Sequence, residues 1–223
     1  MPKRAMRPTG DLAPRNAPVQ ARGRRSIARI LEAAHVVLRR DGSEAATTVA
    51  FAAEAGVAVG SLYHYFPNKE AVILALYEEK LTALRAFTLT LPGPSGDWRG
   101  DLRAWILAIK AHELEIGFDF ALFDAVQHYA RLNVVAHEHA DGMAKVFAAR
   151  LRALGSGWSD AALYDVALNA FFLNAASWLY WQASGGYAQR ATDRLADAVI
   201  AVVAPALEGD AEPEGPHLKP RET

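Results

Sequence analysis

The chain has 223 residues, 52% of them hydrophobic, and a formal net charge of −1 at pH 7. This length suits a small domain joined to a larger one, and the apolar content suffices for packed cores. The absence of cysteine excludes disulfides, cysteine-based zinc sites and thiol nucleophiles, and it suits a reducing cytoplasm. The most apolar stretch, residues 166–181, is interrupted by polar side chains, so we expect a cytoplasmic protein that does not span a membrane.

The charge is distributed unevenly along the chain. Residues 1–80 hold 12 Lys and Arg against 8 Asp and Glu, whereas the remainder holds 12 against 17. A basic N-terminal part favours a polyanionic partner at that end. Residues 1–24 are rich in Pro, Arg and Gly without a period, which predicts a disordered basic arm. Its first 20 residues can serve as a solubilising tail, and the arginines that adjoin the first helix, Arg22, Arg24 and Arg25, can reach a DNA minor groove.

Helical periodicity begins at Ser26, where apolar residues follow one helical face as far as Leu38 and Gly42 then predicts the end of the helix. Thr47 or Thr48 provides an N-cap for a short helix that runs to about Ala55. A turn at Gly56 and a second short helix through Tyr65 follow. Pro67 ends this helix, and Asn68 caps a long one over residues 69–89.

Residues 91–96 form a Pro- and Gly-rich break, and further helices are predicted beyond it. One is marked by Leu102, Trp105, Ile106 and Ile109, and the others span about 118–131, 134–154, 159–183 and 192–207. No strand pattern appears, so the predicted fold is all-α. We divide it into a helix-turn-helix domain at 25–70, a linking helix at 69–89, a helical domain at 95–207 and a disordered acidic tail at 208–223.

Residues 47–65 have the size and spacing of a helix-turn-helix. Gly56 lets the chain reverse, and the small Ala52, Ala53 and Ala55 let the two short helices approach each other closely. Gly60 and Ser61 have little bulk, so the second helix can lie against a phosphate backbone. Tyr63 and His64 carry polar tips that can reach phosphates or base edges.

The run TTVAFAAEAGVAVGSLYHYFPNKE at residues 47–70 resembles the tetracycline-repressor (TetR) family of transcriptional regulators. The preceding residues 30–34 and Gly42 resemble that family's first helix and its end. The resemblance is close over about residues 24–78 and only architectural beyond them. It implies an N-terminal three-helix DNA-binding domain and a larger C-terminal domain for ligand binding and dimerisation.

The resemblance also implies a set of DNA-contacting residues. Thr48 matches a phosphate contact at the start of the second helix, and Lys69 matches a phosphate-contacting lysine. The implied set is Thr47, Thr48, Ala58, Val59, Gly60, Ser61, Tyr63, His64, Tyr65 and Lys69. Val59 departs from the polar or basic residues common there, because it can touch a thymine methyl group but cannot hydrogen-bond a base. Recognition then depends more on His64 and on DNA shape.

Taken singly, these residues have structural interpretations as well. Tyr63 and Tyr65 can be core aromatics, and for Phe66 the core is the preferred interpretation. Thr48 alone is a helix cap, and Lys69 alone is a solvated charge. The joint pattern at fixed spacing favours DNA binding.

Aromatic and histidine residues are dense after Pro94. Most must form core, but an apolar cavity with few polar groups is also how small-molecule sites are built. In the resembling family the effector pocket corresponds to residues 98–185. We predict that a mainly apolar or aromatic effector contacts Trp105, His112, Phe123, His128, Asn174 and Trp178.

The predicted helix at 159–183 is apolar on almost every side, so it needs two packing partners. One face can pack within its own domain and the other on a second subunit. Together with residues 192–207, this helix resembles the family's four-helix dimer interface. We therefore expect a homodimer that binds an inverted-repeat operator in double-stranded DNA.

An enzyme is the main alternative class. The sequence holds no nucleotide-binding glycine loop, zinc-protease motif or nucleophile elbow, so we assign no catalytic residue and no cofactor. The adjacent His112 and Glu113 are the acid–base candidates, and no motif supports them. His137 and His139 lie two apart on a helix and point in nearly opposite directions, so we assign no metal and expect a solvated face. A DNA-binding regulator without an effector is the other alternative.

Overall fold

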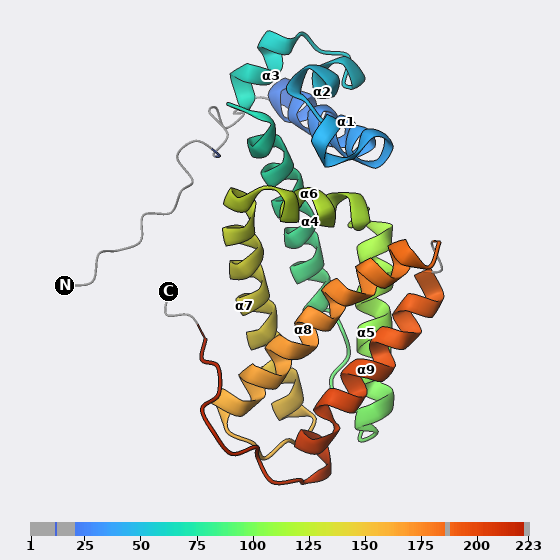
Figure 1. Cartoon of the computed structure of the whole chain (residues 1–223), viewed down its shortest axis with the longest axis vertical. Coiled ribbons are helices and arrows are strands. Elements are labelled where there is room, and N and C mark those ends of the chain that lie inside the picture. Colours follow the sequence, from blue (N-terminus) through green and yellow to red (C-terminus); the bar gives the residue numbers. More distant parts are fainter. Residues whose placement is uncertain (1–11, 13–20, 186–187, 221–223) are drawn as a thin grey trace, which may run out of the picture. The chain divides into compact units, whose positions relative to one another are not determined.

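The computed structural model describes residue 12, residues 21–185 and residues 188–220. Over these residues the chain is helical and contains no strand, which confirms the predicted all-α class (Figure 1). The helices are α1 Ala21–Ala45, α2 Thr48–Glu54, α3 Val59–Tyr65, α4 Lys69–Thr88, α5 Trp98–Glu115, α6 Phe120–His128, α7 Ala130–Ala153, α8 Asp160–Ala183 and α9 Ala188–Glu208. None of these helices has both the length and the apolarity needed to cross a bilayer.

The chain divides into two compact units. The N-terminal unit contains the described residues up to Ala83 together with Gly117–Val135, and the C-terminal unit contains Leu84–Ile116 and the described residues from Ala136 onward. The boundaries therefore fall within α4, between α5 and α6, and within α7. This differs from the predicted single domain at 95–207, because α6 belongs to the N-terminal unit.

The first helix departs from its predicted limits at both ends. α1 begins at Ala21, inside the range expected to be disordered, while residues 1–11 and 13–20 of that range lie outside the described residues. Gly42 has φ +77° and ψ 174°, a conformation that is essentially restricted to glycine. It interrupts the helix instead of ending it, since helical structure continues to Ala45.

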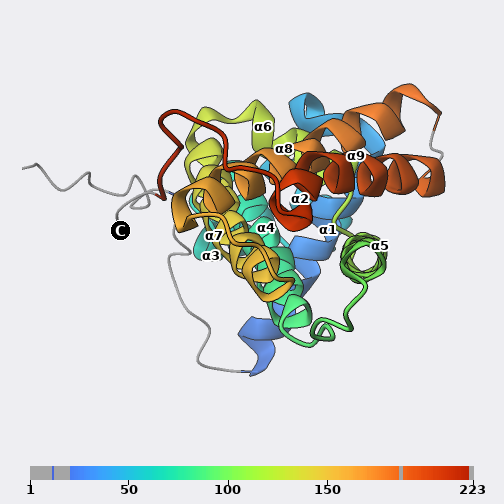
Figure 2. The same cartoon turned by 90° about the horizontal axis from the view of Figure 1, so that it is seen from below.

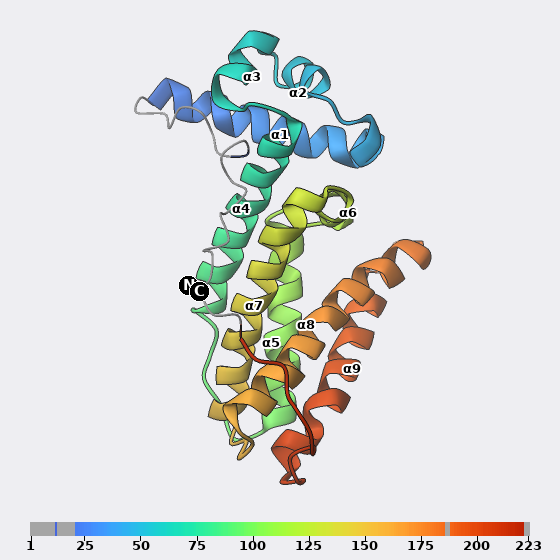
Figure 3. The same ribbon diagram turned by 60° about the vertical axis from the view of Figure 1, so that its left-hand side comes forward.

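The helix-turn-helix is built on caps and a small core. Thr47 Oγ1 accepts a hydrogen bond from the Ala50 N–H at 3.0 Å, and Asn68 Oδ1 accepts one from the Ala71 N–H at 2.8 Å. Figure 3 shows α1 running beneath α2 and α3. Phe66 is fully buried in this unit, which confirms its interpretation as a core residue.

Polar contacts join α1 to α6, to the N-cap residue of α6 and to Tyr129, the residue that follows α6. The ring of His35 lies 3.0 Å from Asp119, and the Ser43 hydroxyl donates to Asp124 at 2.9 Å. The Tyr129 hydroxyl donates to the Ser43 carbonyl at 2.8 Å. These contacts explain why α6 belongs to the N-terminal unit although it lies far from α1 in sequence.

A single helix was expected at about 118–131, but the structure divides it. α6 ends at His128, and Tyr129 has the extended backbone angles φ −101° and ψ 109° before α7 begins. Asp119 caps α6 by accepting the Leu122 N–H at 3.1 Å. At this division the Tyr129 side chain contacts the Ser43 carbonyl near the end of α1 and the ammonium of Lys69.

The C-terminal unit encloses an apolar core between α5, α7, α8 and α9. Trp105, Phe147, Leu163 and Val199 contribute to it. α8 packs along α9 (Figures 1 and 3), and α5 also packs against α9 (Figure 2). α9 begins at Ala188, earlier than the predicted start at residue 192.

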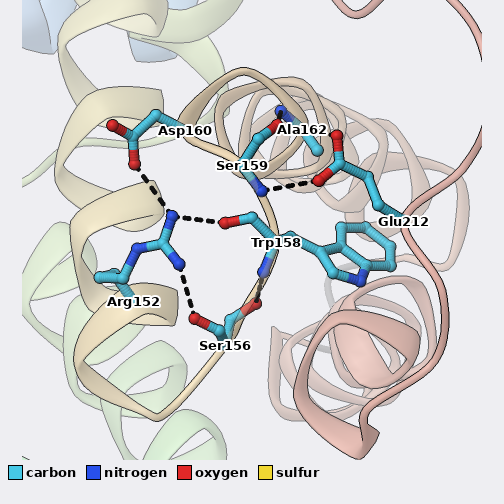
Figure 4. Close-up of polar contacts among 7 residues, drawn as sticks. All are labelled: Arg152, Ser156, Trp158, Ser159, Asp160, Ala162 and Glu212. Carbon is cyan, nitrogen blue, oxygen red and sulfur yellow. Dashed lines mark hydrogen bonds and ion pairs between the residues drawn. The ribbon is translucent and has the colours of Figure 1, made fainter.

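The expected disordered tail instead packs against the start of α8 (Figure 4). The Glu212 carboxylate accepts the Ser159 N–H at 2.7 Å and the Ser159 hydroxyl at 2.8 Å. Trp158 Nε1 donates to the Asp210 carbonyl at 2.9 Å, and His217 lies 3.2 Å from Glu212. The tail has no regular secondary structure over residues 210–220, but these side-chain contacts fix its path.

Candidate nucleic-acid interface and ligand site

The turn between α2 and α3 is held by an arginine from α1. The Arg29 guanidinium donates to the Ala55 carbonyl, and the Val57 N–H donates to the Ala52 carbonyl at 3.0 Å. Gly56 has φ +62°, and a Cβ added there would lie 3.1 Å from the guanidinium. Position 56 therefore favours glycine for two reasons. The backbone angle suits glycine, and the Arg29 guanidinium occupies the space that a Cβ would need. The sequence analysis had not assigned a role to Arg29.

The residues predicted to contact DNA all keep some exposure, and the burial in α3 falls on Leu62 instead. An added Cβ at Gly60 would meet no atom within 4 Å, so this surface is open. The exposed residues are Thr47, Ala58, Gly60, Ser61, Tyr63 and His64. The partly exposed ones are Thr48, Val59, Tyr65 and Lys69.

Two of these residues bind each other. The Thr48 hydroxyl lies 3.0 Å from the Tyr63 hydroxyl, a hydrogen bond that joins the first residue of α2 to α3. Tyr63 is 41% exposed, so it belongs to the surface and is not the core aromatic that a single-residue interpretation allows. The bond fixes the angle at which the Tyr63 ring leaves α3.

Lys69 has a structural role in addition to its predicted one. Its ammonium group donates to the Ala46 carbonyl at 3.1 Å and lies 5.2 Å from the centroid of the Tyr129 ring. Ala46 immediately precedes Thr47, the residue that caps α2. Lys69 thus positions the start of α2, and since an ammonium has three donors it can still bind a phosphate. No local sequence signal indicates the bond to Ala46.

Two of the predicted ligand residues come together in the C-terminal unit. The ammonium of Lys110 lies 3.0 Å from Asn174 Oδ1 and 3.7 Å from the centroid of the Trp178 ring. The same ammonium forms an ion pair with Glu113 at 2.6 Å. The Lys110 and Glu113 side chains are 7% and 3% exposed, so the ion pair is buried.

Lys110 has no predicted role, and Glu113 is predicted only as an acid–base candidate that no motif supports. The sequence nevertheless contains a signal for this buried pair. Both Lys110 and Glu113 continue the buried face that apolar residues begin on α5, namely Leu102, Ile106 and Ile109. Charged residues at i and i+3 on an otherwise apolar face predict a buried pair rather than a solvated one.

Trp105 and His112 lie elsewhere in the same unit. Trp105 stacks on Phe147 within the core, with the ring centroids 5.2 Å apart. His112 stacks on Phe87 at 4.0 Å. For Trp105 this contact favours the core interpretation over a lining role.

Phe123 and His128 belong to the N-terminal unit, on α6. Phe123 packs at 6.3 Å from Phe120, and His128 is exposed with its ring edge against Tyr129. Within the C-terminal unit, Asn174 and Trp178 are brought together at Lys110, while Phe123 and His128 belong to the other unit.

His137 and His139 differ sharply in environment. His137 is exposed, whereas His139 is 5% exposed and packs edge-on against Phe171 at 5.6 Å. Burial, with a smaller contribution from the charge of Arg85, lowers the pKa of His139 to about 4. The expected solvated face is thus wrong for His139. Over the described residues, no group of His, Asp and Glu has an arrangement that could hold a metal ion.

The chain resembles known proteins in its N-terminal sequence and in its fold. Residues 30–76 match the family model described as bacterial regulatory proteins, tetR family. No curated protein matches the chain.

Solved structures share the fold along most of the chain. A TetR-family transcriptional regulator from Streptomyces coelicolor is 24% identical, with a TM-score of 0.61 over 82% of this chain and 99% of that one. A transcriptional regulator from Rhodococcus sp. Rha1 is 20% identical, with a TM-score of 0.62 over 84% and 100%. A SmeT–triclosan complex is 18% identical, with a TM-score of 0.62 over 79% and 90%. Because these sequence identities are 24% or lower, the similarity to the solved structures shows a shared fold.

Proposed function

We propose that this chain, whose residues 30–76 match the model of the tetR family of bacterial regulatory proteins, is a transcriptional repressor that binds an inverted-repeat operator. The observation that carries the proposal is the exposed outer face of α3, set at a fixed angle to α2 by Arg29 and by the bond between Thr48 and Tyr63. A recognition helix must be both accessible and rigidly oriented to enter a major groove. We place the protein in the cytoplasm and assign it no enzymatic activity.

Selection of binding sites from random duplexes tests the DNA-binding function. A two-fold dimer should select a symmetric motif whose half-sites lie about one DNA turn or somewhat more apart. His64→Ala should change the preference among sequences more than the overall affinity. Selection that returns no symmetric motif contradicts the proposal.

The salt dependence of binding tests the role of Lys69. Lys69→Ala should weaken binding to every sequence and lower the salt slope by about one phosphate contact. Lys80→Ala is the matched control, because it removes the same charge from the same helix three turns later. Equal salt slopes for the two variants would show that Lys69 makes no specific contact with a phosphate.

The repressor is proposed to be a homodimer joined through α8 and α9. Phe172, Leu179 and Tyr180 on α8 are 47%, 58% and 41% exposed, which is high for large apolar side chains on one helix. Light scattering of the intact chain should give a dimer at micromolar concentration, and Leu179→Glu should give a monomer with weakened operator binding. Val146→Glu on α7 is the control, because Val146 is also exposed. A monomeric wild-type protein contradicts the dimer.

We further propose that a small, mainly apolar or aromatic effector releases the repressor from DNA. The SmeT–triclosan complex supports this, since it joins a small molecule to a protein of the same fold. Among the candidate contacts Trp105, His112, Phe123, His128, Asn174 and Trp178, the last two have the strongest support, because they adjoin the buried Lys110.

Mass spectrometry of the natively purified protein, followed by operator release with the retained compound, tests effector control. Effector and operator binding should antagonise each other by a coupling of about 1–3 kcal/mol. If every compound that binds leaves operator affinity unchanged, effector control fails and the DNA-binding proposal still stands.

A further inference from the structure

Two exposed valines lie in the helix-turn-helix, each in the first turn of its helix. Val49 on α2 is 59% exposed, although it is a β-branched apolar residue that normally packs. Val59 on α3 is partly exposed. The other exposed or partly exposed residues beside them in sequence include Ala50 and Ala58, which also lack polar side-chain atoms.

The hydrogen bond between Thr48 and Tyr63 joins the first turn of α2, which contains Val49, to the face of α3 that contains Val59. Val59 precedes Tyr63 by four residues, so the two lie on the same face of α3. Val49 directly follows Thr48, at the end of α2 that this 3.0 Å bond holds against α3. The bond therefore holds the first turn of α2, with the 59% exposed Val49, beside the face of α3 that carries the partly exposed Val59.

Neither helix carries the side chains that usually recognise guanine or adenine. α2 and α3 contain no Arg, Lys, Asn or Gln, so bidentate contacts to purine edges cannot come from them. Glu54, the charged residue of α2, is paired with Arg40 at 2.8 Å. The major-groove feature that an aliphatic side chain recognises is the 5-methyl group of thymine.

We propose, resting on the DNA-binding function above, that Val49 and Val59 recognise thymine methyl groups in the major groove of the operator. The two residues determine sequence preference by apolar contact, and each half-site contains a thymine opposite each valine. His64 and Ser61 supply the polar contacts beside them.

Replacement of thymine by deoxyuridine in the selected operator tests the inference, because it removes only the methyl group. Each thymine is replaced in turn, in both half-sites together, and affinity is measured for the wild type, Val49→Ala and Val59→Ala. Because each replacement removes one methyl contact in each half-site, the wild type should lose about sixteenfold in affinity at each contacted position, about fourfold for each methyl group. Each alanine variant should bind the thymine and deoxyuridine forms equally at its own position. Val36→Ala on α1, which removes a valine that is 37% exposed, should keep the full preference.

The outcomes separate this inference from the function on which it rests. If the protein binds its operator but no deoxyuridine replacement changes affinity by as much as twofold, methyl recognition is overturned while DNA binding stands. If one alanine variant retains the preference for thymine at every position, the inference is overturned for that valine. If the protein selects no duplex at all, the proposed function fails and this inference fails with it.

Discussion

The two units use charged side chains in opposite ways. In the C-terminal unit, Lys110 and Glu113 form an ion pair whose side chains are almost fully buried. In the N-terminal unit, Asp119 binds His35 and also Arg39, whose side chain is 65% exposed. A buried pair must be complete, because either charge alone has no water to solvate it, whereas Asp119 keeps 15% exposure and a second partner in the exposed Arg39, so the loss of one of its contacts costs less. We therefore expect three changes in stability, which decrease in size from Glu113 to His139 to Asp119.

The largest effect should follow from breaking the buried pair. Glu113→Leu leaves Lys110 charged and buried, so the free energy of unfolding should fall by about 3–5 kcal/mol. Urea unfolding followed by tryptophan fluorescence measures this. The double variant Lys110→Met with Glu113→Leu removes both charges and should recover most of the stability, since a buried pair can often be replaced by apolar residues without loss. A double variant as unstable as the single one would show that the pair is needed for more than its charge balance.

The second effect concerns His139, which burial keeps neutral. Its pKa in the folded protein is about 4, below the 6.5 of an ordinary histidine. Its contribution to stability is therefore present above pH 6.5 and is lost as the pH falls toward 4, by about 3 kcal/mol in total. His139→Phe should abolish this part of the pH dependence in urea unfolding, whereas His137→Gln, an exposed neighbour on α7, should keep it. Parallel pH profiles for the wild type and His139→Phe would contradict the assignment.

The smallest effect belongs to the edge contact at Asp119. Burial alone would raise the pKa of Asp119, but the hydrogen bond and charge of His35, the Leu122 N–H and Arg39 together hold it below the usual aspartate range. Because the folded pKa is depressed, this contribution to stability is present at neutral pH and is lost as the pH falls below about 4.

Asp119→Asn should therefore lower the free energy of unfolding at pH 7 by about 1 kcal/mol and increase hydrogen exchange in α6. Asp124→Asn is the control, since the amide oxygen can still accept from Ser43. If Asp119→Asn lowered the free energy of unfolding as much as Glu113→Leu does, the difference between the two units would be contradicted.

The local features of the fold could be predicted from sequence because their causes are local. Thr47 and Asn68 cap the helices they were expected to cap, each through a bond to a backbone N–H three residues later. Leu62 is the large aliphatic residue among the seven of α3, and it is the one that is buried. The opposite face of the helix is therefore exposed.

The missed features depend on partners that are distant in sequence. Asn174 meets Lys110 across 64 residues, and His35 meets Asp119 across 84. No periodicity within α5 or α6 encodes such pairings. The effector contacts were predicted from residue type alone, and residue type does not distinguish Trp105 in a core from Trp178 beside a charged cluster.

Gly117 constrains how this sequence can change over generations. Its φ is +74°, and an added Cβ would lie 2.9 Å from His35 Cε1. A side chain at position 117 therefore needs a smaller residue at position 35, yet a smaller residue at 35 first loses the contact to Asp119. Each single step is unfavourable although the pair of changes relieves the clash. Positions 35 and 117 should thus be epistatic, and drift at one should be blocked until the other changes with it.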